Sequence, residues 1–167
     1  IKCNYGLFEH QVNALNEISE VLNKKRGRVM LHMPTGSGKT RTAITFASEY
    51  LRKEEATVIW LASQEELCEQ AYSEFKIAWP HLGNRDINSY RFWGKHEQPV
   101  DFHDGFIVMG LDKANGLLQT DSQYLAGLPN NALIIFDEAH QAIAPTYSHV
   151  TEFLVGPSGE GKLLGLT

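Results

Sequence analysis

Apolar residues recur along the chain with two alternating periods, one typical of amphipathic helices and one typical of buried strands. From Glu9 to about Lys24 they recur every three or four positions, which predicts a helix. The same spacing predicts helices at 40–52, 65–77 and, shorter, 112–119. Short apolar runs predict strands at 29–33, 57–62, 87–92, 106–109, 132–136 and 163–166.

Strands that alternate with helices form βαβ units, so this order predicts an α/β fold with a mostly parallel sheet and helices on both faces. Between the predicted elements, 93–104 is expected to be a polar loop and 157–161 a turn. In such sheets ligands bind beyond the carboxyl ends of the strands, and candidate chemistry should therefore be sought there.

Composition and charge narrow the classes of protein. With 167 residues, 43% of them hydrophobic and 21% charged, the chain fits one globular domain rather than a disordered segment. A net charge of −5 argues against a generic polyanion-binding domain but leaves room for a local nucleic-acid groove. The longest apolar run, 132–136, is too short to span a membrane, so no membrane association is expected.

Cysteine usage and the chain ends suggest the setting. Cys3 and Cys68 form no paired motif, and a reducing cytoplasmic location is the simple expectation. The chain begins at Ile1 without a signal-peptide pattern and stops at Thr167 just after an apolar run. We therefore expect it to be a piece of a longer protein.

A glycine-rich segment follows the strand predicted at 29–33 and leads directly into a helix. Residues 33–40 are Met-Pro-Thr-Gly-Ser-Gly-Lys-Thr, with Met33 where the strict phosphate-loop pattern has glycine. Glycines let backbone N–H groups approach an anion, and a helix N-terminus favours negative charge. Lys39 would meet the β- and γ-phosphates and the Thr40 hydroxyl a Mg²⁺ ion. The predicted phosphate-binding residues are Thr35, Gly36, Ser37, Gly38, Lys39 and Thr40.

Two adjacent carboxylates, Asp137 and Glu138, follow the apolar strand predicted at 132–136. In P-loop ATPases an acid at a strand end holds Mg²⁺ through water, the role that Asp137 fits. Glu138 would lie beside the γ-phosphate and polarise the attacking water. His140 could contact the phosphates or relay to a partner domain, or simply bond to a loop carbonyl.

Together, Gly-Ser-Gly-Lys-Thr and Asp-Glu-Ala-His resemble motifs I and II of DEAH-type superfamily-two helicases and translocases, most closely the motor domains of restriction enzymes and related DNA translocases. The resemblance implies a three-layer RecA-like P-loop NTPase domain over 1–167 that uses ATP and Mg²⁺. It also implies Lys39, Asp137 and Glu138 as catalytic residues, and Gln11 as the glutamine that reads adenine. The expected partners are nucleic acid, DNA favoured over RNA, and a second RecA-like domain with the arginine fingers.

Three further segments resemble the family's other motifs. Residues 61–70 resemble motif Ia, with Leu67 and Gln70 matching its Leu-x-x-Gln. Residues 109–113 occupy the place of the motif that often begins with threonine, and 164–167 resemble the start of motif III. Among the tryptophans, Trp60 should be core, and Trp93 is the one to test for base stacking.

Other interpretations stay open from the sequence. An RNA helicase or nucleic-acid sensor would share this core, and a non-catalytic P-loop adaptor or a small-molecule kinase would share the phosphate loop. Lys39 and Glu138 together argue against an adaptor, because a pure binder needs no water-activating acid. The basic run at 24–28 is interpreted as a solvated helix end. Residues His96, Asp101, His103 and Asp104 match no metal-ligand spacing and are interpreted as a polar loop.

Overall fold

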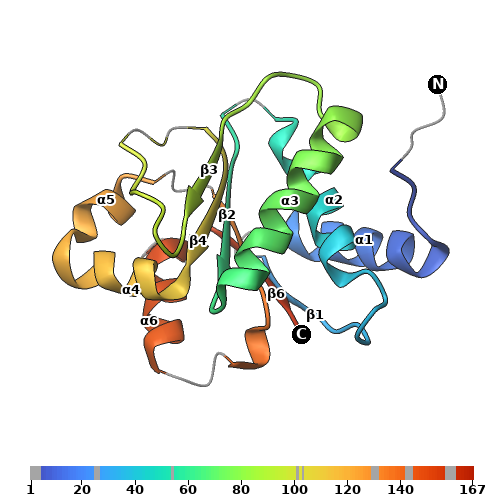
Figure 1. Ribbon diagram of the computed structural model, residues 1–167. Helices are drawn as coiled ribbons and strands as arrows, with labels where there is room; N and C mark the ends of the chain where they lie inside the picture. The colour runs from blue at the N-terminus through green and yellow to red at the C-terminus, as the bar shows by residue number, and fades with distance from the viewer. Residues whose placement is uncertain are drawn as a thin grey trace.

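Six parallel strands form one sheet in the order β1-β6-β5-β2-β4-β3, with helices on both faces (Figure 1). The computed structural model describes residues 5–24, 27–53, 55–100, 102, 104–128, 132–141, 145–156 and 161–167. The strands are β1 (Arg28–Leu31), β2 (Thr57–Ala62), β3 (Ser89–Phe92), β4 (Gly105–Gly110), β5 (Leu133–Phe136) and β6 (Lys162–Leu166). The predicted strands and the α/β class are confirmed, and every strand pairing of the described residues is parallel.

The helices divide into two layers. α1 (Glu9–Leu22), α2 (Lys39–Leu51) and α3 (Glu65–Leu82) cover one face, and α4 (Leu111–Thr120), α5 (Ser122–Ala126) and α6 (Pro145–Val155) cover the other (Figure 1). A 3₁₀ turn, η1 (Ala139–Gln141), follows β5. Within the described part of the chain, no helix is both long enough and apolar enough to cross a membrane.

The alternation of side chains along each central strand feeds two hydrophobic cores. In β2, Val58 and Trp60 pack towards α2 and α3, whereas Ile59 and Leu61 pack towards the helices of the opposite face. β4 and β5 divide their side chains in the same way, and all three strands are buried along their whole length. Strands covered on both faces read as continuous apolar runs, which is why the sequence identified them.

Three elements differ from the sequence expectations. α3 continues to Leu82 although Pro80 lies inside it, because the loss of one N–H near a helix end is small and the indole of Trp79 bonds Arg85 O at 3.0 Å beyond that end. α5 and α6 were not predicted. α6 starts at Pro145 and turns only part of its surface inward, with Val150 and Leu154 buried, so its apolar period is weak.

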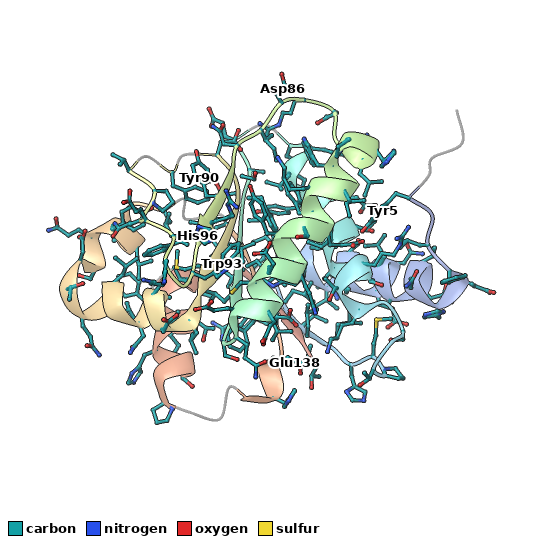
Figure 2. All side chains as sticks on the ribbon, viewed as in Figure 1. Tyr5, Asp86, Tyr90, Trp93, His96 and Glu138 are labelled. Carbon is teal, nitrogen blue, oxygen red and sulfur yellow. The ribbon has the colours of Figure 1, made fainter. Side chains whose placement is uncertain are left out.

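Trp93 does not offer a base-stacking surface. Its side chain is 4% exposed, and its ring centroid lies 5.9 Å from that of Tyr72 and 4.8 Å from that of His96. Figure 2 labels Trp93 and His96. The packing of the 93–97 segment against α3 buries it, which the polar sequence around it did not indicate. Trp60 is fully buried, as expected.

The other polar candidates have structural partners or lie outside the description. Asp104 forms an ion pair with Arg85 at 2.6 Å, while Asp101 and His103 are outside the described residues. The described residues contain no cluster of three or more His, Cys, Asp or Glu that could hold a metal. Cys68 is a buried free thiol. Cys3 and residues 25–26 of the basic run, like 157–160 of the predicted turn, are also outside the description.

Candidate nucleotide site

The loop between β1 and α2 is held open by two left-handed glycines. Gly36 and Gly38 have φ angles of +79° and +84°, a conformation that disfavours any residue with a Cβ. A Cβ on Gly38 would also come within 2.0 Å of the Gln11 amide nitrogen. α2 begins directly after Gly38 without a side-chain cap, so its first backbone N–H groups remain available to an anion.

The start of this loop is fixed to the end of the chain, and the loop is also bonded internally. At its start, the backbone N–H of Met33 donates to the carbonyl of Thr167 at the end of β6, at 3.1 Å. Met33 is buried, so the place of the usual first glycine is filled by a core side chain. Within the loop, the Ser37 hydroxyl donates to Pro34 O at 2.6 Å. The loop is therefore a defined turn rather than a free segment.

Gln11 joins helix α1 to this loop. Its side-chain oxygen accepts the Phe8 backbone N–H at 2.9 Å, and its Nε2 donates to Ser37 O at 3.1 Å. The His10 ring lies 3.1 Å from the same carbonyl. Gln11 is 2% exposed, so its amide braces the phosphate loop, whereas Phe8 beside it is 73% exposed and stacks on His10.

The acidic strand end meets the loop directly. Lys39 Nζ lies 3.0 Å from Glu138 Oε1, although 99 positions separate the two residues. The second carboxylate oxygen of Glu138 lies 3.0 Å from His140 Nδ1, which is also 3.3 Å from the Thr167 hydroxyl. Glu138 lies at the edge of the molecule opposite Asp86, close to the end of the chain (Figure 2). Residues that sequence analysis assigned to one site thus converge at the carboxyl edge of the sheet.

Glu138 has a strained backbone. Its φ of 54° is left-handed, a conformation that costs a residue with a side chain about 1–3 kcal/mol. The carboxylate that this turn presents is bonded on both oxygens, to Lys39 and to His140. Such strain is found where a side chain must be aimed, and here it aims Glu138 across the loop.

Asp137 is almost completely buried, with 3% of its surface exposed. Its backbone N–H donates to Leu61 O at 2.8 Å, which continues the pairing of β5 with β2. Burial raises the pKa of its carboxyl from 3.8 to about 6; the Lys39 charge opposes this rise and the Glu138 charge adds to it. Keeping this carboxyl charged therefore costs the fold free energy.

We expect Asp137→Asn to stabilise the nucleotide-free chain at pH 8. A carboxyl whose pKa is raised on folding favours the fold below its unfolded pKa and loses that contribution as pH rises through the folded value near 6. The asparagine amide does not ionise and so avoids this loss. The free energy of unfolding should therefore rise by about 1–3 kcal/mol at most. Urea unfolding at pH 8 and pH 5 measures it, and the gain should be smaller at pH 5.

The matched control for that measurement is Asp86→Asn, an exposed aspartate at the other end of the molecule (Figure 2). Its free energy of unfolding should change by less than about 0.5 kcal/mol. An Asp137→Asn chain that is no more stable than the wild type at pH 8 would show that the buried carboxylate is not destabilising.

Sequence reasoning missed two features around the site. Arg41, next to Thr40, donates to Gly6 O at 3.2 and 3.0 Å and lies 3.9 Å from the centre of the Tyr5 ring. The Tyr5 hydroxyl in turn donates to Glu74 on α3, so residues 5–8 are anchored to α2 and α3. The second feature is the Trp60 indole beside Asp137. Both depend on contacts between distant segments, which leave no local pattern.

Several known proteins are similar to this chain. A candidate ATP-dependent RNA helicase of African swine fever virus is 26% identical over 145 residues, which cover 87% of this chain and 26% of that protein. The UvrABC system protein B of Protochlamydia amoebophila is 35% identical over 98 residues, which cover 58% of this chain and 14% of that protein. The chain thus spans about a quarter of the length of the viral relatives and less of the bacterial one.

Solved structures share the fold. The type ISP restriction-modification enzyme LlaGI, solved with a DNA substrate mimic, superposes with a TM-score of 0.65 at 20% identity, covering 97% of this chain and 17% of that one. The Hef helicase domain of Pyrococcus furiosus gives 0.65 at 22% identity, covering 95% and 32%. The UvsW helicase of bacteriophage T4 gives 0.63 at 16% identity, covering 95% and 51%.

The parallel six-stranded sheet with flanking helices therefore defines the first RecA-like motor domain of the superfamily-two helicases and translocases. Within that class, the chain belongs to the family of the type III restriction enzyme res subunit, whose sequence profile matches residues 4–167. The resemblance to restriction-enzyme motors that the sequence indicated is confirmed at the level of the family.

Proposed function

We propose that residues 1–167 are the ATP-binding first motor domain of a longer nucleic-acid-dependent ATPase, with ATP held between loop 33–40 and the end of β5. The observation that supports this most strongly is the 3.0 Å contact of Lys39 with Glu138, which joins the glycine-rich loop to the acidic strand end. A cation and an acid at one sheet edge, beside a free helix N-terminus, suit a triphosphate and its hydrolysis.

In this proposal the phosphates bind to the backbone of the loop, from Thr35 through Gly36, Ser37 and Gly38 to Lys39. Lys39 changes partners as they bind, leaving Glu138 for the β- and γ-phosphate oxygens. The exchange is feasible because the Lys39 side chain is partly exposed, at 17%, and can therefore be reached by an incoming phosphate. The contact between Lys39 and Glu138 keeps both side chains aimed at the site.

Thr40 and Asp137 fit a Mg²⁺ ion. Both offer oxygen ligands, which this ion prefers, and it keeps several waters, so two protein side chains suffice. The desolvated carboxylate of Asp137 is the kind of group whose charge a divalent cation would stabilise. When bound, the ion would neutralise phosphate charge, with Thr40 and Asp137 holding it in place.

Glu138 is the proposed base for the attacking water. Once Lys39 has moved to the phosphates, Glu138 Oε1 is free to accept a proton, while Oε2 stays with His140. The contact of His140 with Thr167 would link Glu138 to the end of β6. We therefore propose that His140 acts on the phosphate end indirectly, by orienting Glu138.

Gln11 is proposed to read adenine beside the phosphate loop, where one of its two amide bonds, to Phe8 N–H or to Ser37 O, would open to admit the base edge. Its amide already holds Ser37 O, so a base edge reaching it would be coupled to the phosphate loop. The exposed ring of Phe8 offers a flat apolar surface next to it.

The free thiol of Cys68 suits a reducing, cytoplasmic location.

We favour duplex DNA over RNA as the track of the motor, together with a second RecA-like domain that closes over the nucleotide. The family of restriction-enzyme subunits and the LlaGI complex with a DNA substrate mimic support DNA. An RNA helicase is the second candidate, which the name of the viral relative supports. Stimulation of ATP hydrolysis by duplex DNA or by RNA separates the two.

Nucleotide binding to the chain tests the proposal. Lys39→Ala should weaken the binding of ATP by about 10–100-fold, because it removes a charge-assisted hydrogen bond worth about 1.5–3 kcal/mol. Titration with a fluorescent ATP analogue measures the affinity. Lys76→Ala, at an exposed lysine of α3, is the control and should bind like the wild type. Equal affinities for the two variants would refute the proposed site.

A further inference from the structure

Trp60 brings a polar atom into the core beneath the proposed nucleotide site. Its side chain leaves β2 towards α2 and α3, is fully buried, and packs on Phe106 with ring centroids 6.4 Å apart. The indole N–H is inaccessible and has no hydrogen-bond partner among the described residues. A buried donor without a partner costs the fold free energy, so its position calls for a physical reason.

The candidate acceptor for this N–H is the Asp137 carboxylate, which lies beside it. Asp137 is 3% exposed, and its backbone is tied to Leu61, the residue that follows Trp60. The indole N–H lies beside this carboxylate and favours its charged form, although the two groups do not meet in a well-formed hydrogen bond. A donor and an acceptor, both buried, thus face each other with the bond unmade.

A ring without an N–H would fill the same space. Trp60 shares this face of β2 with Val58 and Ala62, and both of these residues are apolar and fully buried. A phenylalanine at position 60 would bury its ring against Phe106 without stranding a donor. Packing alone therefore does not explain the indole nitrogen, and we look to its neighbour Asp137 for the reason.

We propose that Trp60 is a positioning residue for Asp137: its indole N–H donates to the carboxylate and so orients the group that would hold the Mg²⁺ of a bound nucleotide. The inference rests on the proposed function, in which Asp137 holds that ion. Groups that hydrogen-bond a metal-binding carboxylate fix its orientation, and their loss typically lowers metal affinity about 10–100-fold. Trp60 would thus join the core of the sheet to the metal position.

The first test observes the indole directly, in the 167-residue chain. ¹⁵N–¹H spectra resolve the N–H signals of Trp60, Trp79 and Trp93, which Trp→Phe variants assign. Addition of Mg²⁺ with a non-hydrolysable ATP analogue should move the Trp60 signal downfield and slow its exchange with solvent. Asp137→Asn, which keeps the tryptophan, should remove most of that downfield movement, because a neutral amide oxygen is a weaker acceptor.

The second test measures the need for metal. Trp60→Phe should raise the Mg²⁺ concentration for half-maximal binding of the analogue about tenfold, with metal-free binding unchanged. Trp79→Phe is the matched control. It removes an indole that donates to Arg85 O at 3.0 Å, away from the site, and should leave the Mg²⁺ requirement as in the wild type.

The outcomes separate the two claims. A wild-type chain that binds no nucleotide would overturn the proposed function, and this inference with it. Nucleotide binding with an unmoved Trp60 signal, or with the same movement in Asp137→Asn, would overturn the inference alone. The spectra decide even if Trp60→Phe fails to fold, since both the wild type and Asp137→Asn retain the indole.

Discussion

Glu138→Gln in the protein that contains both motor domains is expected to lower the turnover of ATP by about 10²–10⁴-fold, the usual contribution of a general base. Glutamine keeps the size of the side chain and can still contact Lys39, but it cannot accept a proton from water. Affinity for ATP should therefore remain within a few-fold of the wild type. Steady-state hydrolysis and equilibrium binding, measured on the same preparation, separate the two effects.

The control for this variant is Glu17→Gln, at an exposed position of α1. It should hydrolyse ATP at the wild-type rate. If Glu138→Gln turned over within threefold of the wild type, Glu138 could not be the base, and the strained turn that presents it would need another explanation.

The second large effect concerns the partner domain. The 167-residue chain alone should hydrolyse ATP about 10³–10⁵ times more slowly than a protein that includes the second motor domain. That ratio is the usual contribution of an arginine finger supplied across the cleft. Lys39 and the loop amides can hold the phosphates, but charge that develops on the γ-phosphate in the transition state needs a further cation from outside.

The comparison uses both proteins under one set of conditions, with and without duplex DNA. We expect DNA to stimulate the two-domain protein and to leave the isolated chain slow. Robust, DNA-stimulated hydrolysis by the isolated chain would contradict the proposal, since the described site would then be complete without its partner. Stimulation of the two-domain protein by RNA and not by DNA would favour the RNA helicase.

Segments buried on both sides were predicted accurately from the sequence, whereas segments buried on one side were predicted only where their apolar period is strong. β2, β4 and β5 were predicted within a residue or two at each end because both of their faces meet helices. α6 was missed because its position follows from packing on the sheet, through Val150 and Leu154, rather than from a strong period of its own. The local pattern of apolar residues therefore predicts an element only where both of its faces are buried or where its buried positions recur with a strong period.

The proximity of the glycine-rich loop and the acidic strand end was predicted for a similar reason. Parallel strands bring their carboxyl ends to one edge, so the loop after β1 and the acids after β5 were expected at the same edge, and Lys39 lies 3.0 Å from Glu138 there. The roles of these residues stay predictions. Contacts fixed by packing could not be predicted. Trp93 is buried, Gln11 braces Ser37, and the indole of Trp60 lies beside Asp137.

The central claim is tested most directly by a crystal structure of the chain with Mg²⁺ and a non-hydrolysable ATP analogue. We expect the triphosphate within the 33–40 loop, the metal between Thr40 and Asp137, and Lys39 moved from Glu138 to the phosphates. A nucleotide bound elsewhere, or bound there with the Lys39–Glu138 contact intact and no metal at Asp137, would contradict the account.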